Sequence, residues 1–158
     1  MSGIYHLERQ QIIPVTPEIA WDYFATPRNL EEMTPPSLSF RIQWGGDEAM
    51  HAGQLIGYRV KVAPLVWVNW LTEITVVETG RVFVDEQRRG PYRLWHHLHR
   101  FTAVAGGTAV FDRVTYQLPF GPCGSLLHAV WIRRQLTRIF AFRADHLVRR
   151  FGLPPQGT

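Results

Sequence analysis

Residues 93–116 read RLWHHLHRFTAVAGGTAVFDRVTY, two strand-like runs joined by the double glycine Gly106-Gly107. Two glycines between flanks rich in β-branched and aromatic residues are a strong signal for a β-hairpin. Alternate side chains of an extended run share one face, so His97 and His99 project together. The stretch therefore predicts an antiparallel pair of strands with two histidines on one face.

Similar runs extend outward from this hairpin toward the N-terminus. Short breaks separate them at Gly45-Gly46, Pro64, Thr79-Gly80 and Gly90-Pro91. Such short breaks predict an antiparallel meander, and a further strand is expected at the start of the chain. The expected strands cover residues 4–15, 38–44, 53–62, 66–77, 81–88, 93–104 and 108–118.

Helical signals lie on both sides of the meander. Thr16 can cap a short helix that has Pro17 in its first turn and ends at Pro27, and a second short helix covers 29–33. After the meander, 125–151 has the spacing of one long amphipathic helix. Its apolar stripe consists of Ile132, Leu136, Ile139, Phe140, Leu147 and Phe151.

The order of elements is strand, two short helices, six strands and a long helix. A seven-stranded antiparallel sheet needs one face covered, and one long helix is available to cover it. The fold class is therefore α+β, with a strongly curved sheet wrapped around the C-terminal helix. This arrangement predicts an internal cavity between helix and sheet.

Composition limits the class of protein. The 158 residues fit one domain over 1–158, with 46% hydrophobic residues, 13% aromatic residues and a net charge of +4. Acidic and basic residues are interleaved, so we expect no nucleic-acid partner. Cys123 is the single cysteine, which excludes an intrachain disulfide. The start lacks a signal-peptide pattern and the chain lacks a long apolar run, so we expect a cytoplasmic protein.

Four groups of residues carry a resemblance to a known family. They are Ala20-Trp21-Asp22-Tyr23-Phe24 with Asn29-Leu30 and Thr34-Pro35-Pro36; Phe83-Val84-Asp85-Glu86-Gln87 with Gly90-Pro91-Tyr92, Trp95, His97, His99 and Phe101; Gly106-Gly107-Thr108 with Asp112, Val114, Tyr116, Leu118-Pro119 and Gly121; and Arg133-Arg134 with Leu136, Ile139-Phe140 and Arg143. In these residues the chain resembles the SRPBCC superfamily, which includes START domains, birch-pollen-allergen-like proteins and polyketide cyclase/dehydrase-like proteins. The resemblance implies a helix-grip fold over almost the whole chain.

The candidate site lies on the polar positions of the strands. Alternate residues of the runs 81–88, 93–104 and 108–118 form three stripes, which begin at Phe83, Trp95 and Val110. We expect these stripes to face inward and to line the cavity together with the last helix. Their neighbours on the opposite face, such as Val82, Val84 and Phe111, could fill the core instead. An aromatic wall with a few polar groups suits a mostly apolar ligand with one polar end. The predicted ligand-binding residues are Phe83, Asp85, Trp95, His97, His99, Phe101, Asp112, Tyr116, Ile132, Leu136 and Phe140.

The histidines allow two other interpretations. His97 and His99 could ligate Zn or Fe if Asp85 or Asp112 supplied a third ligand. Two histidines without a visible third partner favour a polar seam in a pocket wall, so we expect neither a metal nor another cofactor. A catalytic cluster of His97, Asp112 and Tyr116 could support aldol cyclisation or dehydration of a polyketide. Buried carboxylates should also meet a histidine or Arg113.

The sequence favours a binding protein that holds a lipid, isoprenoid, polyketide or aromatic molecule, with the short helices and the loop after Tyr116 as a gate. A cyclase/dehydrase that uses the same pocket is the alternative, and an interaction module with a vestigial cavity is a third. Trp67 and Trp70 are three residues apart on one strand, so one should line the interior while the other lies outside. The outer tryptophan could make transient contact with a membrane. The sequence identifies no partner protein.

Overall fold

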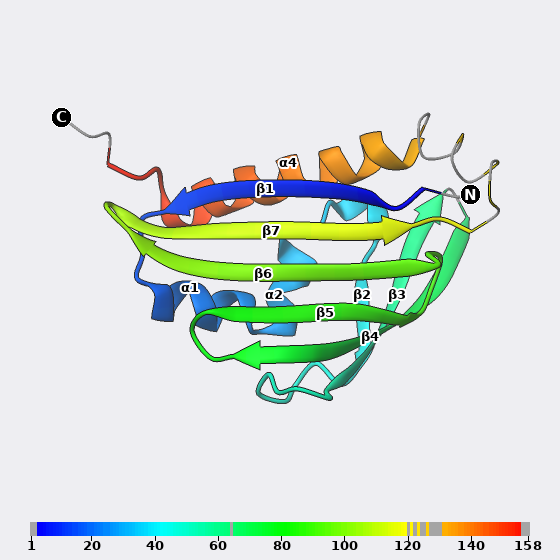
Figure 1. Cartoon of the computed structure of the whole chain (residues 1–158), viewed down its shortest axis with the longest axis horizontal. Coiled ribbons are helices and arrows are strands. Elements are labelled where there is room, and N and C mark those ends of the chain that lie inside the picture. The colour runs from blue at the N-terminus through cyan, green and yellow to red at the C-terminus, as the bar shows by residue number, and fades with distance from the viewer. Residues whose placement is uncertain are drawn as a thin grey trace.

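A computed structural model describes residues 3–63, 65–119, 121, 123, 126 and 131–155 of the chain. Seven antiparallel strands form one curved sheet in the order β1-β7-β6-β5-β4-β3-β2. The helices α1, α2 and α4 lie on the same side of this sheet (Figure 1). The bounds are β1 Tyr5–Ile13, α1 Pro17–Phe24, α2 Pro27–Glu32, a 3-10 turn Pro36–Leu38, β2 Arg41–Trp44, β3 Leu55–Ala63, β4 Val66–Glu78, β5 Val82–Arg89, β6 Leu94–Val104, β7 Gly107–Gln117 and α4 Arg133–Phe151.

The predicted helix-grip architecture is confirmed. The double glycine forms the β6–β7 hairpin, in which Val104 pairs with Gly107. Gly106 takes the left-handed φ of 85° that the turn requires. A Cβ on Gly107 would lie 2.0 Å from the carbonyl oxygen of Ile13, so β1 can approach only because this residue has no side chain.

Two element boundaries differ from those predicted, and one predicted capping bond does not form. Pro27 begins α2, because proline suits the first turn of a helix. Residues 36–38 form a 3-10 turn, and the strand predicted at 38–44 begins only at Arg41. Thr16 stands at the N-cap of α1, but its hydroxyl makes no capping hydrogen bond. The predicted start of the long helix at Ser125 and residues 127–130 lie outside the described residues, and α4 is described from Arg133.

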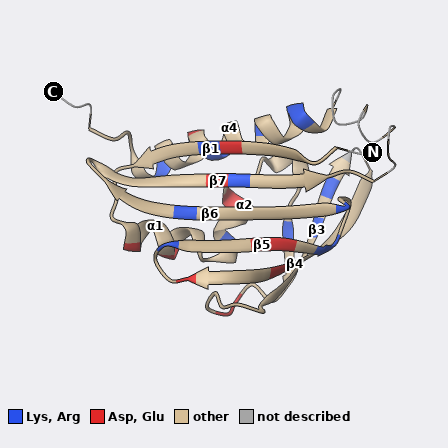
Figure 2. Ribbon diagram, in the orientation of Figure 1, with Lys and Arg blue, Asp and Glu red and all other residues tan. Residues whose placement is uncertain are grey.

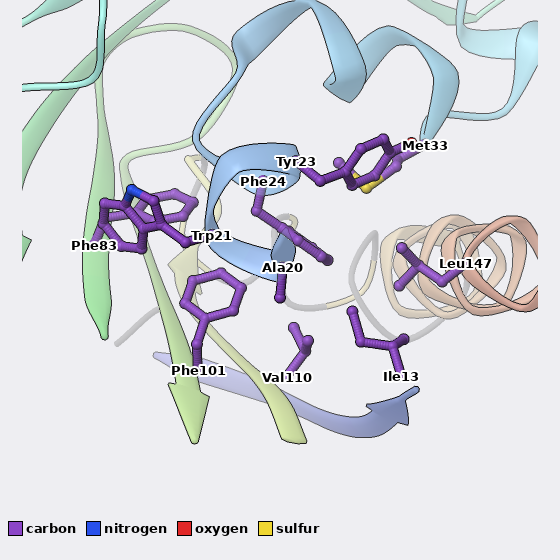
Figure 3. Packing of buried hydrophobic residues seen from close by; sticks show 10 residues of the cluster. All are labelled: Ile13, Ala20, Trp21, Tyr23, Phe24, Met33, Phe83, Phe101, Val110 and Leu147. Carbon is purple, nitrogen blue, oxygen red and sulfur yellow. The ribbon is translucent and has the colours of Figure 1, made fainter. Parts of the chain in front are cut away.

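Among the described residues, the core consists of three apolar clusters. In the first, Trp21 and Phe24 of α1 pack edge-on against Phe101, and Trp21 also meets Phe83 (Figure 3). The second joins α4 to the inner face of β7 through Leu136, Phe140, Val114 and Tyr116. The third gathers Ile56, Tyr58, Val60 and Ile74 of β3 and β4. The helix α1 thus packs on β6 and β7 and α4 packs on β1 and β7, while the third cluster lies on β3 and β4.

Figure 2 shows acidic and basic residues distributed over the strands of the sheet. On the outer face Arg113 pairs with Glu8 at 2.7 Å, and both side chains are about half exposed. Pairs of this kind contribute little to stability. Within the part of the chain that the structure describes, no helix is both long and apolar enough to cross a membrane.

Candidate ligand cavity

A cavity of about 370 Å³ lies between the inner face of the sheet, α2 and α4. That volume falls within the range of small-molecule sites. Most of the bordering elements contribute mainly apolar side chains: Leu30 and Met33 from α2 and its end, Val60 and Trp70 from β3 and β4, and Ile132, Leu136 and Phe140 from the C-terminal segment. A ligand that filled this space would therefore be largely apolar.

One region of the cavity wall is polar. His97 and His99 project from the same face of β6, and the strand pairing places Asp85 of β5 directly opposite His97. His99 Nε2 hydrogen bonds to Asp85 Oδ2 at 2.9 Å, and His97 Nδ1 lies 3.5 Å from the same oxygen. The carboxylate and both imidazoles border the cavity. We call Asp85, His97 and His99 the polar wall.

A second carboxylate supports the polar wall from behind. Asp112 of β7 lies opposite His99 in the strand register, and its Oδ1 accepts a hydrogen bond from His97 Nε2 at 2.9 Å. The same oxygen is 3.0 Å from His99 Nδ1, whose N–H is not directed at it closely enough for a hydrogen bond. Arg143 of α4 donates to Asp112 at 3.1 Å. The histidines are thus held between two carboxylates.

These contacts set the ionisation of the two acids. Burial alone raises the pKa of the Asp112 carboxyl, but Arg143 and both histidines hold this pKa well below its usual range. Burial acts on Asp85 in the same direction, and His97 and the hydrogen bond from His99 lower its pKa below the ordinary value. Both carboxylates are therefore charged at neutral pH.

The two histidines respond in opposite directions. Burial lowers the pKa of His97, and repulsion from His99 adds to this effect. Burial also acts against charge on His99, but its contacts with Asp112 and Asp85 raise the pKa of this imidazole above the ordinary value. A protonated His99 beside a neutral His97 gives the cluster of two carboxylates and Arg143 no net charge.

Eight of the eleven predicted ligand-binding residues line the cavity. The other three, Phe101, Asp112 and Tyr116, do not, because helices cover them. Phe101 packs under α1, whereas Tyr116 and Asp112 lie on β7 beneath α4. The eight are Phe83, Asp85, Trp95, His97, His99, Ile132, Leu136 and Phe140.

The expectation that the buried carboxylates meet a histidine is confirmed, since Asp85 and Asp112 both contact His97 and His99, but Arg113 is not among their partners. Arg113 follows Asp112 on a strand, so it projects to the outer face and pairs with Glu8. The buried carboxylate is instead met by Arg143, 6% exposed, which the sequence analysis did not select as a site residue. Its signal was present: Arg143 falls three residues after Phe140 and four before Leu147, on the apolar stripe of the helix.

Two tyrosines on the cavity wall were also missed. Burial and the nearby charge of Asp85 raise the pKa of the Tyr58 phenol, and burial raises that of Tyr92. Both remain neutral hydroxyl groups at physiological pH. Of the two tryptophans, Trp70 lines the cavity and Trp67 lies outside near Arg59, which confirms the predicted split.

A second hollow of about 280 Å³ adjoins the cavity at the start of α4. The two share Leu38, Trp131, Gln135 and Ile139. Arg134 and Arg138 border the hollow but not the cavity. The cavity thus has a more polar neighbour between the 3-10 turn and α4.

The curved sheet, the long helix and the apolar cavity define a helix-grip protein of the SRPBCC superfamily, a fold that binds hydrophobic ligands. The sequence itself identifies the family within this superfamily. Residues 5–152 match the model described as polyketide cyclase / dehydrase and lipid transport, and the chain belongs to that family. Among curated proteins, none matches the sequence.

Solved structures share the fold at low sequence identity. The Zhui aromatase/cyclase from Streptomyces sp. R1128 is 14% identical, with a TM-score of 0.71, 94% of this chain covered and 93% of that one. A protein from Thermus thermophilus, TTHA0849, is 16% identical, with a TM-score of 0.67 and coverages of 92% and 99%. Ara h 8.0201 is 17% identical, with a TM-score of 0.61 and coverages of 93% and 99%. These likenesses concern the fold alone.

Proposed function

We propose that the protein binds an amphipathic small molecule, with its apolar body in the cavity and its polar end at Asp85, His97 and His99. The observation that carries this proposal is the buried polar wall in a cavity that is otherwise largely apolar. A hydroxyl at that end would donate a hydrogen bond to the Asp85 carboxylate, since both ring nitrogens of His99 already face Asp85 and Asp112. The aromatic rings of Trp70 and Trp95, 5.1 Å apart, suit a flat or isoprenoid body.

Native mass spectrometry of freshly purified protein tests the binding function, followed by organic extraction of whatever is bound. We expect one apolar adduct per chain. Val60→Trp would fill the cavity from β3 and should abolish the adduct. Val76→Trp is the matched control, because Val76 lies on β4 with 42% of its surface exposed and does not border the cavity.

Two results together would contradict the binding function. The first is a clean mass without adduct. The second is the absence of any thermal stabilisation by fatty acids, isoprenoids and aromatic polyketides, since a ligand that binds only the folded state must raise the melting temperature. An adduct equally abundant in Val60→Trp would place the ligand elsewhere on the protein.

A cyclase or dehydrase is the second candidate, supported by the opposite pKa shifts of His97 and His99. Neighbouring groups whose pKa values are pushed apart can act as base and acid in one reaction. Because Tyr116 does not border the cavity, Tyr58 or Tyr92 would supply the hydroxyl donor. Turnover of a linear poly-β-ketone that is lost in His99→Gln while substrate still binds would establish an enzyme. Binding without turnover in the wild type would favour the carrier.

A further inference from the structure

We propose that Asp85, His97 and His99 form a binding site for a divalent transition-metal ion in the cavity wall, with Asp112 and Arg143 as its supporting groups. The sequence favoured no metal because no third ligand was visible beside the histidines. The strand register now supplies that ligand, since Asp85 lies opposite His97. The site would hold its ion whether or not the cavity contains an organic ligand.

The ligand atoms are already gathered to the required spacing. One nitrogen from each histidine and one oxygen of Asp85 all lie within 4.8 Å of one another. Two of these separations are 2.9 and 3.5 Å, from Asp85 Oδ2 to His99 Nε2 and to His97 Nδ1. Ligands about 2.1 Å from a common tetrahedral ion lie about 3.4 Å apart. Small side-chain movements would therefore admit an ion.

The Asp112 carboxylate contacts both imidazoles and favours the orientation that metal binding requires. His97 Nε2 donates to Asp112, which leaves the lone pair of Nδ1 on the side of Asp85. His99 Nδ1 lies next to the same carboxylate, so its Nε2 faces Asp85 as well. A metal-bound histidine usually has a carboxylate on its other nitrogen, which sets the tautomer and strengthens the ligand. Here one carboxylate serves both histidines, and Arg143 holds it in place.

Charge and burial favour a cation at this point. Arg143 balances Asp112, which leaves the charge of Asp85 facing two imidazole nitrogens in a buried wall. A proton on His99 Nε2 now bridges His99 and Asp85. A divalent ion in its place would bind Asp85, His97 and His99 together. Three protein ligands leave at least one coordination position directed to other molecules, as in catalytic rather than structural zinc sites. An oxygen atom of a molecule in the cavity could occupy it.

Titration with Co²⁺ and Zn²⁺ tests the site. The protein should carry no affinity tag and should first be treated with a chelator. Calorimetry gives the stoichiometry, and the visible spectrum of bound Co²⁺ reports its geometry. Asp85→Asn and His99→Gln remove one ligand each. His96→Ala is the matched control, because His96 neighbours His97 in sequence but projects from the opposite face of β6.

We expect one ion per chain with a four- or five-coordinate Co²⁺ spectrum. Loss of one ligand should weaken binding at least about 100-fold, and Asp112→Asn should weaken it about 10- to 100-fold through the support that it removes. His96→Ala should bind like the wild type. Circular dichroism of each variant excludes unfolding as the cause, and the wild-type Co²⁺ spectrum tests the site without any substitution.

Two results would overturn the proposal. The first is that the wild-type protein binds less than one ion per chain, or binds Co²⁺ with the octahedral spectrum of the hydrated ion. The second is equal affinity in the wild type and Asp85→Asn. Failure of the cavity to take up an organic molecule would leave the ion titration unchanged, so the metal site and the binding function are tested separately.

Discussion

The guanidinium of Arg143 lies 3.1 Å from the carboxylate of Asp112, and this buried pair joins α4 to the middle of β7. Both side chains are almost fully buried. The pair therefore holds the helix against the sheet and balances the acid that supports the histidines. Its two functions, in stability and in the site, can be separated by substitution.

Arg143→Met should lower the free energy of unfolding by about 3–5 kcal/mol, because it leaves the Asp112 carboxylate buried without its cation. Urea denaturation monitored by circular dichroism measures the loss. Arg138→Met, on the exposed face of the same helix, should change stability by less than about 0.5 kcal/mol. Equal losses of unfolding free energy in the two variants would show that the buried pair does not stabilise the protein.

The double variant Asp112→Asn/Arg143→Met should recover part of the loss, since no uncompensated charge then remains in the interior. The double-mutant cycle isolates the interaction of the two side chains. Strict additivity of the two single losses would contradict the pairing.

The pH dependence of unfolding should have an acid limb from the carboxylates. The folded pKa values of Asp85 and Asp112 are lowered, so their contribution is fully present above the unfolded pKa of about 3.9 and is lost as pH falls through the folded values. Chelator-treated protein should therefore lose stability steeply below about pH 4. Asp112→Asn should flatten this limb.

Near neutral pH the two histidines should act in opposite directions. The pKa of His99 is raised, so its contribution is present below the unfolded pKa of about 6.5 and is lost as pH rises through the folded value. The pKa of His97 is lowered, so its neutral form costs stability as pH falls below about 6.5. In His99→Gln the decrease in unfolding free energy with rising pH should disappear. A wild-type profile that stays flat from pH 5 to 9 while the His99→Gln profile is also flat would contradict both shifts.

Asp85→Asn should change which ligands bind rather than whether they bind. A ligand whose hydroxyl donates to the Asp85 carboxylate should lose about 10-fold in affinity, because the charged acceptor is gone. An apolar analogue without the hydroxyl should bind the wild type and the variant equally. Displacement of a fluorescent apolar dye measures both affinities. Equal losses for the two ligands would mean that the carboxylate does not meet the polar end.

Gly107→Ala should destabilise the protein strongly, because the added Cβ would lie 2.0 Å from the carbonyl oxygen of Ile13 and the residue has a φ of 145°. Gly53→Ala is the control: its φ is 88°, and a Cβ there would meet nothing within 4 Å. The control should cost about 1–2 kcal/mol from backbone strain alone. A similar cost at both positions would contradict the close approach of β1 to the hairpin.

The fold followed from local signals, namely the glycine and proline breaks, alternation in the strands and the helical stripe before Phe151. The site was harder, because alternation tells which residues share a face but not which part of that face a helix covers. Tyr116 and Trp95 pair across β7 and β6, yet α4 covers the first and the cavity borders the second. Arg143, in the middle of α4, was missed as a site residue because an arginine on an amphipathic helix is expected to face solvent.

The cavity also separates the interior residues into those enclosed by neighbours and those that border open space. Side chains of the first two clusters that do not border the cavity, such as Val110, Val114 and Leu147, are enclosed by neighbours, so a change in their volume is costly. Side chains such as Leu30, Val62 and Trp70 border open space, and a larger or smaller residue there meets less resistance. Substitutions can therefore accumulate on the wall and alter which ligands fit, while the enclosed side chains preserve the architecture. A fold of this kind can change its specificity over evolutionary time without first losing its stability.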